Sequence, residues 1–469
     1  MEYHAAMPSE LGKSLQDFLL NDTKNEEICF ATWYPAAGKQ RFTALIHSSI
    51  FPRRGERVRH GNVSALPPYV DRAKELARSA GSGLAIIHTH PLGRGWQGLS
   101  GPDQFYERDV LSREVFGITG YPLVGMTLAG DGTWSARIYE RAPKKTPVLR
   151  WCSAVRLVGK NLTLHFNEHL RPPAEPGEEL MRTTSVWGPN LESHIMRLRV
   201  GVIGVGSVGS VVTEILARIG VGEIYLMDYD KVENHNLDRL LYATKSDVGK
   251  SKANLVKKNV KRSATNQGFK CHAFPRHSIV EEEGYEIAKD CDVLFSCVDR
   301  PWPRQVLNHI AYSSLIPVID GGVSFKTKDF RLIHGMFRAQ TVGPGRACLN
   351  CLGAYDSGEV QMDREGKLSD PSYIEELRKQ GAEPSRQNIM PFAMGLASLE
   401  TIQFVELVTN IGRHGDLGQQ PYDYYTGELH PRFCTCSKGC EYVNLTAKGD
   451  TKKPFLAQDI SKKRDYGDC

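Results

Sequence analysis

The sequence predicts an α/β protein with two parts, a mixed α/β part followed by a doubly wound parallel sheet. Helical and strand-like runs follow one another irregularly over residues 10–150, whereas apolar strands and helices alternate regularly from Arg199 onward. Regular alternation is typical of a parallel sheet with helices on both faces. A Pro- and Glu-rich run over residues 171–180, RPPAEPGEEL, separates the two patterns and is typical of a linker.

A chain of 469 residues exceeds one ordinary domain. We therefore expect a first domain over residues 1–150, a connecting segment over 151–179, a second domain over 180–445 and a mobile polar tail over 446–469. With 41% hydrophobic and 24% charged residues the chain is not a disordered scaffold. A net charge of +5 does not indicate a nucleic-acid or membrane-surface partner.

The N-terminus has no secretory pattern, and no window approaches the roughly 20 apolar residues that a spanning helix needs. Five of the eleven cysteines crowd into two short runs, which favours metal binding in a reducing compartment over a disulfide framework. We expect a soluble cytoplasmic protein.

The first part is expected to open with a helix over residues 10–21, where leucines recur at helical spacing. Strands rich in β-branched and aromatic residues and a polar helix come after it. The later elements are expected as strands at 27–35 and 41–51, a helix at 71–81, and strands at 83–88, 121–130, 133–142, 151–159 and 161–166.

Two histidines and an aspartate form the first candidate site. His88 and His90 alternate at the end of a strand, and Asp103 returns from the next loop. Two imidazoles and one carboxylate suit zinc, and three protein ligands leave a fourth position open, as in a catalytic site. A catalytic site also needs a carboxylate to move the proton. We expect Glu27 in that role, with its neighbour Glu26 as the alternative, because strand alternation lets only one of them face the metal.

Ser100 could stabilise a developing oxyanion at this site. The order of a distant Glu, His-x-His-Pro and then Ser-x-x-Asp resembles the JAMM, or MPN-plus (JAB), zinc metalloprotease family. The resemblance covers residues 10–150 and implies a mixed sheet and isopeptidase activity after the C-terminal glycine of a ubiquitin-like protein. The stretch from His90 to Asp103 is about two residues longer than the family pattern, which a loop can accommodate.

The second candidate site begins with three glycines, Gly204, Gly206 and Gly209, between a strand and a helix. Backbone N–H groups at such a helix start can bind phosphates. The next strand ends in Asp228, which is placed to meet ribose hydroxyls. Both NAD and ATP remain compatible with these residues.

The residues beyond Asp228 favour ATP, because two cations and a distal aspartate suit a triphosphate and magnesium. The order resembles the ubiquitin-activating superfamily, including ThiF-like sulfur-carrier adenylating enzymes, over residues 180–440. By that resemblance Asp228 binds ribose, Asp299 ligates Mg²⁺, and a homodimer is expected. The phosphate ligands carried over are Asn236, Arg239 and Lys252, with Lys250 as the alternative to Lys252, and Arg182 is carried over as the arginine that reaches a nucleotide, often across the dimer.

Five cysteines suggest a structural Zn²⁺ site. Cys348 and Cys351 form one half, and two of Cys434, Cys436 and Cys440 supply the other half. Residues 352–433 contain no cysteine, although activating enzymes usually carry a nucleophilic thiol there. Either the adenylate passes directly to an acceptor, or a thiol from elsewhere serves.

Together these patterns predict a bifunctional enzyme that resembles prokaryotic ubiquitin-like conjugation modules, with a zinc peptidase and an ATP-dependent adenylating domain acting on one carboxyl terminus. A conjugating enzyme is an expected partner. Sulfur-carrier activation for thiocarboxylate formation and a non-catalytic scaffold remain alternatives. The carrier, the final acceptor and the order of processing and conjugation stay open.

Overall fold

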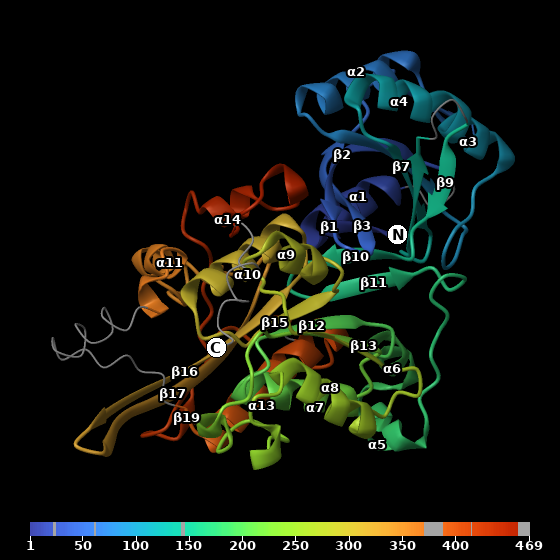
Figure 1. Ribbon diagram of the computed structural model, residues 1–469. Coiled ribbons are helices and arrows are strands. Elements are labelled where there is room, and N and C mark those ends of the chain that lie inside the picture. Colours follow the sequence, from blue (N-terminus) through green and yellow to red (C-terminus); the bar gives the residue numbers. More distant parts are fainter. Residues whose placement is uncertain (22–24, 61, 142–145, 370–387, 414, 458–469) are drawn as a thin grey trace. The chain divides into compact units, whose positions relative to one another are not determined.

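The computed structural model describes residues 1–21, 25–60, 62–141, 146–369, 388–413 and 415–457 (Figure 1). The chain divides into two compact units. Unit 1 comprises Met1–Pro172, Ser313–Leu315 and Leu445–Lys453. Unit 2 comprises the other described residues.

Unit 1 is built on a nine-stranded sheet with the order β11-β10-β1-β3-β2-β6-β7-β8-β9. The pairs β1–β10, β1–β3 and β6–β7 are parallel and the others are antiparallel, which is the mixed arrangement expected for the first part. Helix α1 packs its leucines on one face, and α2 and α4 cover the other. The elements of unit 1 are β1 (Glu2–Pro8), α1 (Ser9–Leu19), β2 (Ile28–Ala37), β3 (Arg41–Ile50), β4 (Arg57–His60), β5 (Asn62–Ala65), α2 (Pro67–Ser79), β6 (Gly83–His90), α3 (Gly101–Phe105), the π-helix η1 (Tyr106–Leu111), α4 (Ser112–Thr119), β7 (Leu123–Ala129), β8 (Trp134–Glu140), β9 (Val148–Trp151), β10 (Ala154–Val158), β11 (Leu162–Phe166) and η6 (Gly449–Thr451).

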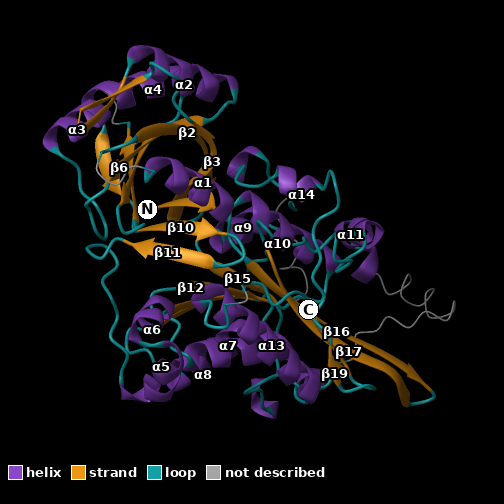
Figure 2. Cartoon of the chain, turned by 180° about the vertical axis from the view of Figure 1, so that it is seen from behind, coloured by secondary structure: helices purple, strands orange, loops and turns teal. Residues whose placement is uncertain are grey.

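Unit 2 contains an eight-stranded sheet with the order β14-β13-β12-β15-β16-β17-β18-β19. Its first five strands are parallel, and the last three are antiparallel additions. Helices α7, α8 and α13 lie on one face and α9 and α10 on the other (Figures 1 and 2), which confirms the doubly wound prediction. The elements of unit 2 are η2 (Glu178–Leu180), α5 (Met181–Trp187), α6 (Pro189–Ile195), β12 (Arg199–Ile203), α7 (Ser207–Arg218), β13 (Glu223–Met227), η3 (Asn234–Asn236), η4 (Lys245–Asp247), α8 (Lys252–Ser263), β14 (Lys270–Phe274), α9 (Glu282–Ala288), β15 (Val293–Ser296), α10 (Pro301–Ser313), β16 (Val318–Lys328), β17 (Arg331–Val342), α11 (Ser357–Arg364), η5 (Lys367–Ser369), α13 (Met390–Thr409), β18 (Gln420–Asp423), β19 (Glu428–Leu429) and α14 (Glu441–Asn444).

The parallel strands of unit 2 place its candidate site. β12 and β15 are short, apolar and buried, as strands covered on both faces must be. The chain leaves β12 toward β13 on one side, and β15 pairs with β12 on the other side. The order of strands therefore reverses between β12 and β15, and ligands of such sheets bind beyond the carboxyl ends of the strands at this point.

Two boundaries differ from the prediction. Residues 151–166 do not connect two domains, because β10 pairs in parallel with β1 and β11 pairs with β10 inside the first sheet. Strand β1 was not predicted, since the sequence predicted a helix as the first element. The division at Pro172 lies in the Pro- and Glu-rich run at residues 171–180 that was predicted to separate the two parts, while the first unit extends beyond the expected end at residue 150.

The expected mobile tail is also partly wrong. Residues 445–453 belong to unit 1, where Ala447 is fully buried and Asp450 Oδ2 accepts a hydrogen bond of 2.7 Å from the Ala37 N–H. The Lys448 ammonium lies 4.5 Å from the centre of the Tyr34 ring, a cation–π contact. A segment with buried and paired groups has a defined place in the fold. Residues 458–469 lie outside the described part of the chain.

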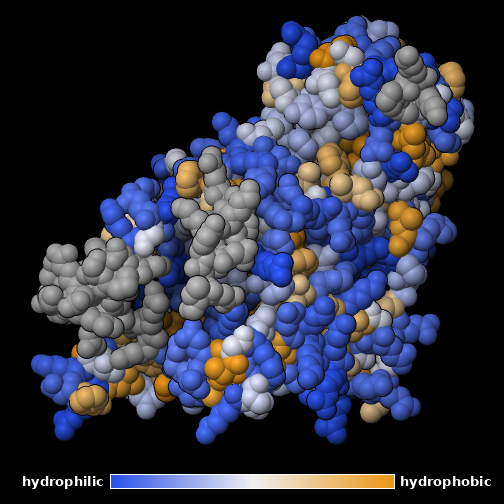
Figure 3. Space-filling view, in the orientation of Figure 1, coloured by the Kyte–Doolittle hydropathy of each residue, from blue (hydrophilic) through white to orange (hydrophobic). Residues whose placement is uncertain are grey.

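Helix α13 is the most apolar helix of unit 2. Among the described residues it alone has the length and composition to cross a membrane, with a mean hydropathy of 1.2, but 61% of that window is buried. It packs against α7, β16 and β17, as a core helix does. Figure 3 shows a largely hydrophilic face, on which hydrophobic residues occur in separate spots.

Candidate functional site

The structure brings His88, His90 and Asp103 together in unit 1. The histidines end β6, and because they are two residues apart on a strand they lie on the same face of the sheet. Asp103 comes from the short helix α3. Each residue offers one ligand atom, and the three atoms lie within 4.8 Å of one another. This grouping fits a single metal ion.

Each histidine has a ring nitrogen whose lone pair can bind a cation. His90 Nδ1 lies 3.1 Å from Gln97 Oε1, so an N–H at Nδ1 leaves the Nε2 lone pair free to bind a metal. His88 is 6% exposed, and its buried Nε2 has no hydrogen-bond partner among the described residues. Burial lowers the pKa of His88 to about 3, which keeps the ring neutral. A buried, neutral and unsatisfied imidazole nitrogen fits zinc.

Ser100 caps α3 and holds the aspartate. Its hydroxyl donates a hydrogen bond of 2.5 Å to Asp103 Oδ2 and accepts one of 3.3 Å from the Asp103 N–H. The structure thus shows Ser100 orienting a ligand, and its expected role with an oxyanion stays a prediction.

Glu27, the residue expected to move the proton, does not face this site. In the β2–β6 pairing Ile28 lies opposite His88, and the ladder continues with a hydrogen bond of 3.0 Å from the Thr89 N–H to the Glu27 carbonyl. Glu27 therefore shares the face of Thr89, opposite to the two histidines. Its carboxylate is 1% exposed and pairs with Arg57, at 2.8 Å, and with Arg59.

Alternation instead places Glu26 on the face of His88 and His90. Its carboxyl group interacts electrostatically with His90 and Asp103, and it is partly exposed. Burial is the largest cause that raises the pKa of Glu26, and the negative charge of Asp103 adds to it, while His90 lowers it. Of the two glutamates considered from the sequence, Glu26 is the one that lies on the face of the histidines.

Glu107, which was not predicted from the sequence, is a buried acid close to His88. It comes from η1, is 2% exposed, and accepts hydrogen bonds from Arg137 Nε at 2.7 Å and from the Tyr139 hydroxyl at 2.9 Å. Its Oε1 lies 4.0 Å from His88 Nδ1. A π-helical turn gives no clear periodic signal, so the sequence could not reveal that this acid turns inward.

In unit 2, Gly204 and Gly206 lie in the turn between β12 and α7, and Gly209 lies in the first turn of α7; together they are called the glycine turn. Gly204 has φ +85°, and a Cβ there would lie 2.5 Å from the Cys297 carbonyl oxygen. A Cβ at Gly209 would lie 2.0 Å from the Gly204 carbonyl oxygen, so only glycine permits this close approach. Gly206 faces open space and precedes the first N–H groups of α7. This turn can receive a phosphate group.

Asp228, at the end of β13, holds the glycine turn. Its Oδ2 accepts a hydrogen bond of 2.7 Å from the Val205 N–H, and its Oδ1 accepts one of 2.8 Å from the Asp230 N–H. Burial raises the pKa of Asp228 to about 6, and the charge of Asp230 adds to this.

We expect this carboxyl group to make stability depend on pH. A pKa raised from 3.8 to about 6 means that the folded protein holds the proton more tightly, so the free energy of unfolding falls as pH rises from 4 to 6. The contribution is at most about 3 kcal/mol, at 1.36 kcal/mol per pKa unit. Urea titrations at pH 4, 5, 6 and 7 without nucleotide should show a flatter profile for Asp228→Asn than for the wild type. Parallel profiles would contradict the shift.

The structure separates the two candidate lysines. Lys252 begins α8, its Nζ lies 2.9 Å from Asp230 Oδ2, and its side chain is 12% exposed. Lys250 pairs with Asp247 at 2.9 Å and is 61% exposed. Lys252 is therefore the lysine linked to the glycine turn. It pairs with Asp230, whose N–H bonds to Asp228, and Asp228 in turn accepts the bond from Val205 in that turn.

Asn236 and Arg239 lie on the segment after β13. Asn236 is 9% exposed, and its Oδ1 accepts a hydrogen bond of 3.0 Å from the Glu233 N–H, which caps the turn η3. Arg239 bonds to the His235 carbonyl and to Asp238, and its side chain is 23% exposed. Both are anchored by local bonds, and their contact with phosphates stays a prediction.

Asp299 lies at the carboxyl end of the parallel strands, as the glycine turn does, whereas Arg182 lies far from that turn. Asp299 is exposed just beyond β15, at the point where the strand order reverses. Arg182 lies on α5 beside Leu180, which contacts Gly220 after the C-terminal end of α7. Helix α7 spans 12 residues, about 18 Å, so one chain does not bring Arg182 to the glycine turn at the other end.

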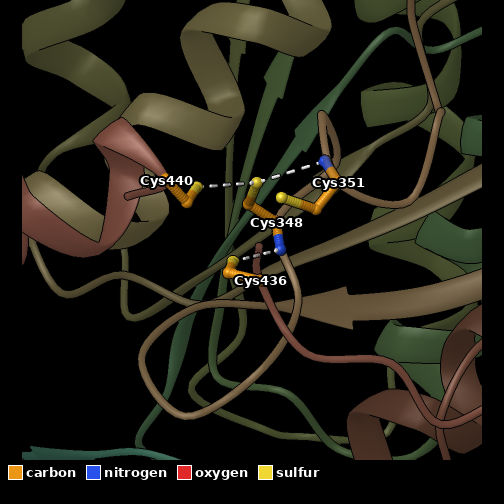
Figure 4. A group of neighbouring side chains, drawn as sticks. All are labelled: Cys348, Cys351, Cys436 and Cys440. Atoms are coloured by element: carbon orange, nitrogen blue, oxygen red, sulfur yellow. Dashed lines mark hydrogen bonds between the residues drawn. The ribbon is translucent and has the colours of Figure 1, made fainter. Parts of the chain in front are cut away.

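Figure 4 shows the cysteine cluster, in which Cys348, Cys351, Cys436 and Cys440 converge. Their sulfur atoms lie within 4.8 Å of one another, with 3.7 Å between Cys348 and Cys440. Four thiolates at Zn–S distances of about 2.3 Å have sulfurs about 3.8 Å apart in a tetrahedron, so the cluster fits zinc. Cys434 is not a member, because the four positions are filled and its own side chain is exposed.

Substitution of single cysteines should show that Cys436 binds zinc and that Cys434 does not. Cys436→Ser is expected to lower the tightly bound zinc by about one ion per chain and to destabilise unit 2, since a structural zinc contributes directly to folding. Cys434→Ser, two residues away, is the matched control and should keep the wild-type zinc content and melting temperature. Equal zinc loss in both variants would contradict the assignment.

Unit 2 thus has the architecture of a Rossmann-like nucleotide-binding protein with a cysteine cluster. The model of the ThiF family matches residues 179–435, and the chain belongs to this family. Residues 1–172 and 445–453 of unit 1 lie outside that match, so the interpretation of unit 1 rests on its own geometry.

Known proteins similar to this chain include "Ubiquitin-like modifier-activating enzyme 5" from Drosophila ananassae, 28% identical over 194 residues, or 38% of this chain and 47% of that protein. The same-named protein from Aedes aegypti is 30% identical over 186 residues, or 37% and 45%. The chain spans about half the length of the curated relatives it matches. Among solved structures, E. coli MccB with MccA-N7isoASN has a TM-score of 0.44 at 18% identity, covering 57% of this chain and 75% of that one.

Proposed function

We propose that unit 2 catalyses ATP-dependent adenylation of the C-terminal carboxylate of a ubiquitin-like or sulfur-carrier protein. The observation that carries this proposal is the glycine turn of β12, which Asp228 holds at the same sheet edge as the Lys252–Asp230 pair. Membership of the ThiF family and similarity to ubiquitin-like modifier-activating enzymes support it.

In this reaction a carboxylate oxygen bonds to the α-phosphorus of ATP, the bond from that phosphorus to the bridging oxygen breaks, and pyrophosphate leaves. No proton transfer is needed, so the residues act by position and charge. We assign Asp228 to the ribose hydroxyls and the triphosphate to Asn236, Arg239 and Lys252. The exposed Asp299 carboxylate offers the hard oxygen ligand that Mg²⁺ prefers, and magnesium would neutralise charge on the leaving pyrophosphate.

We propose that unit 1 is a zinc-dependent peptidase or isopeptidase of the JAMM type. The supporting observation is the convergence of His88, His90 and Asp103, with Glu26 on the same sheet face. These three ligands would hold zinc, which would act as a Lewis acid at the scissile carbonyl. The half-buried Glu26 would accept a proton from the water that attacks the scissile carbonyl carbon and would return it to the amine that leaves as the C–N bond breaks, a role that suits a carboxyl group with a raised pKa.

The cysteine cluster would hold a second, structural zinc. Four protein ligands close the coordination sphere, which leaves no position for substrate. A homodimer remains part of the proposal, because Arg182 would need a partner chain to reach a nucleotide.

If both units act on one carboxyl terminus, covalent linkage raises the local substrate concentration for the second step. Thiocarboxylate formation is the alternative outcome for the adenylate, and a conjugating enzyme or a sulfurtransferase would be the corresponding partner. The segment where a nucleophilic thiol was expected includes residues 370–387, which lie outside the described part of the chain. A scaffold that binds a ubiquitin-like protein without catalysis is the non-enzymatic alternative.

The test is ATP–pyrophosphate exchange with the full chain, Mg²⁺ and a panel of ubiquitin-like and sulfur-carrier proteins ending in Gly-Gly. Exchange that depends on one carrier supports adenylation. No exchange with any carrier, together with no peptide hydrolysis, would support the scaffold and overturn both enzymatic proposals.

A further inference from the structure

A buried carboxylate sits at the end of the parallel sheet in unit 2. Asp320 is 0% exposed and lies beside Ser296, the last residue of β15. The Ser296 hydroxyl donates a hydrogen bond of 2.7 Å to Asp320 Oδ1, and Gln340 Nε2 donates one of 2.9 Å to Oδ2. These bonds fix the carboxylate at the edge where ligands of such sheets bind.

Two arginines from different elements converge on it. Arg304, from α10, places Nε 3.1 Å from Asp320 Oδ1, and Arg338, from β17, places Nη1 3.2 Å from Oδ2. Among the described residues, Asp320 is the one carboxylate within ion-pair distance of either arginine. Two positive charges therefore face one negative charge.

A further acid, Glu400 on α13, is 0% exposed, and no ion pair joins it to either arginine among the described residues. Burial together with the charge of Asp320 raises the pKa of Glu400 well above its ordinary value, while Arg304 and Arg338 lower it. Burial lowers the pKa of Arg338, and the positive charge of Arg304 adds to this, while Asp320 raises it. Within ion-pair distance two guanidinium groups thus share one carboxylate, and an anion would complement the second cation.

Both guanidinium groups keep N–H donors for such an anion. Each offers five N–H groups. Arg338 uses one in the contacts of the described residues, and Arg304 uses two, the second donated to the Gly321 carbonyl at 2.6 Å. Their side chains are 14% and 16% exposed, so the remaining donors can reach solvent.

Gly322 lies next to the guanidinium groups of Arg304 and Arg338 and has no side chain that could cover them. It lies opposite Arg338 in the β16–β17 pairing. A Cβ at this position would lie 3.5 Å from Arg338 Cζ and 3.7 Å from Arg304 Nη2. Gly322 thus places no side-chain atom of its own against the two guanidinium groups, and this position is called the glycine opening.

This opening is close to the glycine turn. Asp320 of β16 pairs with Ser296 of β15, and Ser296 pairs with Ile203, the last residue of β12, so Asp320 and Ile203 are about 10 Å apart, or two strand spacings. β15, between them, continues into Cys297, whose carbonyl contacts Gly204, and then into Asp299. An anion here would lie within reach of a nucleotide bound at that turn.

We propose that Arg304 and Arg338 bind the free carboxylate of the polypeptide tail and position it for attack on ATP. This inference rests on the proposed adenylation. A planar carboxylate matches the paired N–H groups of a guanidinium, and the glycine opening suits a tail that itself ends in small residues. Arg304 and Arg338 act before any bond changes, so they determine binding of the tail and not the release of pyrophosphate.

The test uses a fluorescein-labelled decapeptide ending in Gly-Gly, as the free acid and as the C-terminal amide, with the full chain and a non-hydrolysable ATP analogue plus Mg²⁺. Anisotropy should show that wild type binds the acid at least tenfold more tightly than the amide. Arg338→Gln and Arg304→Gln should lose that preference and keep their affinity for the ATP analogue within about twofold. Equal binding of acid and amide by the wild type would overturn the proposal.

Gly322→Ala provides a variant that should fold, because its new methyl group meets Arg338 at an ordinary van der Waals distance. It leaves both bonds to Asp320 in place and should weaken binding of the acid at least fivefold. Loss of affinity for the ATP analogue in the arginine variants, with peptide preference retained, would assign them to phosphates and contradict the proposal. Failure of the proposed function is distinguishable, since the wild type would then bind no ATP analogue and support no exchange.

Discussion

Glu26→Gln is expected to lower zinc-dependent cleavage by about 10²–10⁴-fold, the usual contribution of a positioned acid–base group, while the zinc content stays unchanged. The reason is the position of Glu26 on the sheet face of His88 and His90, without a place among the three ligands. The measurement is hydrolysis of a peptide whose terminal Gly-Gly is linked by an amide bond to a fluorescent amine. Zinc is quantified in the same samples.

Glu27→Gln is the matched control, because it changes the neighbouring residue in the same way. Cleavage per folded molecule should remain within a few-fold of wild type. The free energy of unfolding should fall by about 1–3 kcal/mol, since the buried bonds from Arg57 and Arg59 lose their charged acceptor. If Glu27→Gln abolishes cleavage and Glu26→Gln does not, the register argument is wrong.

Asp299→Asn is expected to reduce ATP–pyrophosphate exchange at least 10²-fold without affecting cleavage by unit 1. An amide cannot supply the negative charge that Mg²⁺ requires, and charge neutralisation carries most of the barrier reduction in this reaction. Exchange is measured with saturating ATP and the stimulating carrier, and cleavage with the fluorescent peptide. Parallel loss of both activities would show a folding defect and would leave Asp299 without the proposed role.

The lysine pair provides a second comparison within the same site. Lys252→Met should lower exchange about 10- to 100-fold, because Lys252 lies beside Asp230 at the glycine turn. Lys250→Met removes an exposed charge that pairs only locally with Asp247 and should change exchange less than twofold. The reverse ranking would mean that Lys250 reaches the phosphates.

Short-range patterns in the sequence were sufficient to group many of the residues of the histidine site in unit 1 and of the glycine turn in unit 2. The spacing of His88 and His90 requires a common face on any strand, and the glycine turn follows from its place between an apolar strand and a helix. Cys348 and Cys351 likewise stay close in any fold. These features depend on neighbours within a few residues.

Other features depend on the pairing of distant segments. Which of Glu26 and Glu27 faces the histidines is decided by the β2–β6 register, and a shift of one residue reverses the answer. The placement of Cys440 and the exclusion of Cys434 depend on how the last part of unit 2 returns to Cys348. Arg304, Asp320 and Arg338 meet through three separate elements, so no spacing in the sequence could group them.

Residues 445–453 complete unit 1, although residues 173–312 and 316–444 of unit 2 precede them in the chain. During synthesis, therefore, the ribosome must first make nearly all of unit 2 before the segment that covers Tyr34 and Ala37 exists. At about 5–20 residues per second, this delay is on the order of tens of seconds. During this interval residues 1–172 must remain folded, or be protected by a chaperone, while the surface around Tyr34 and Ala37 is still uncovered.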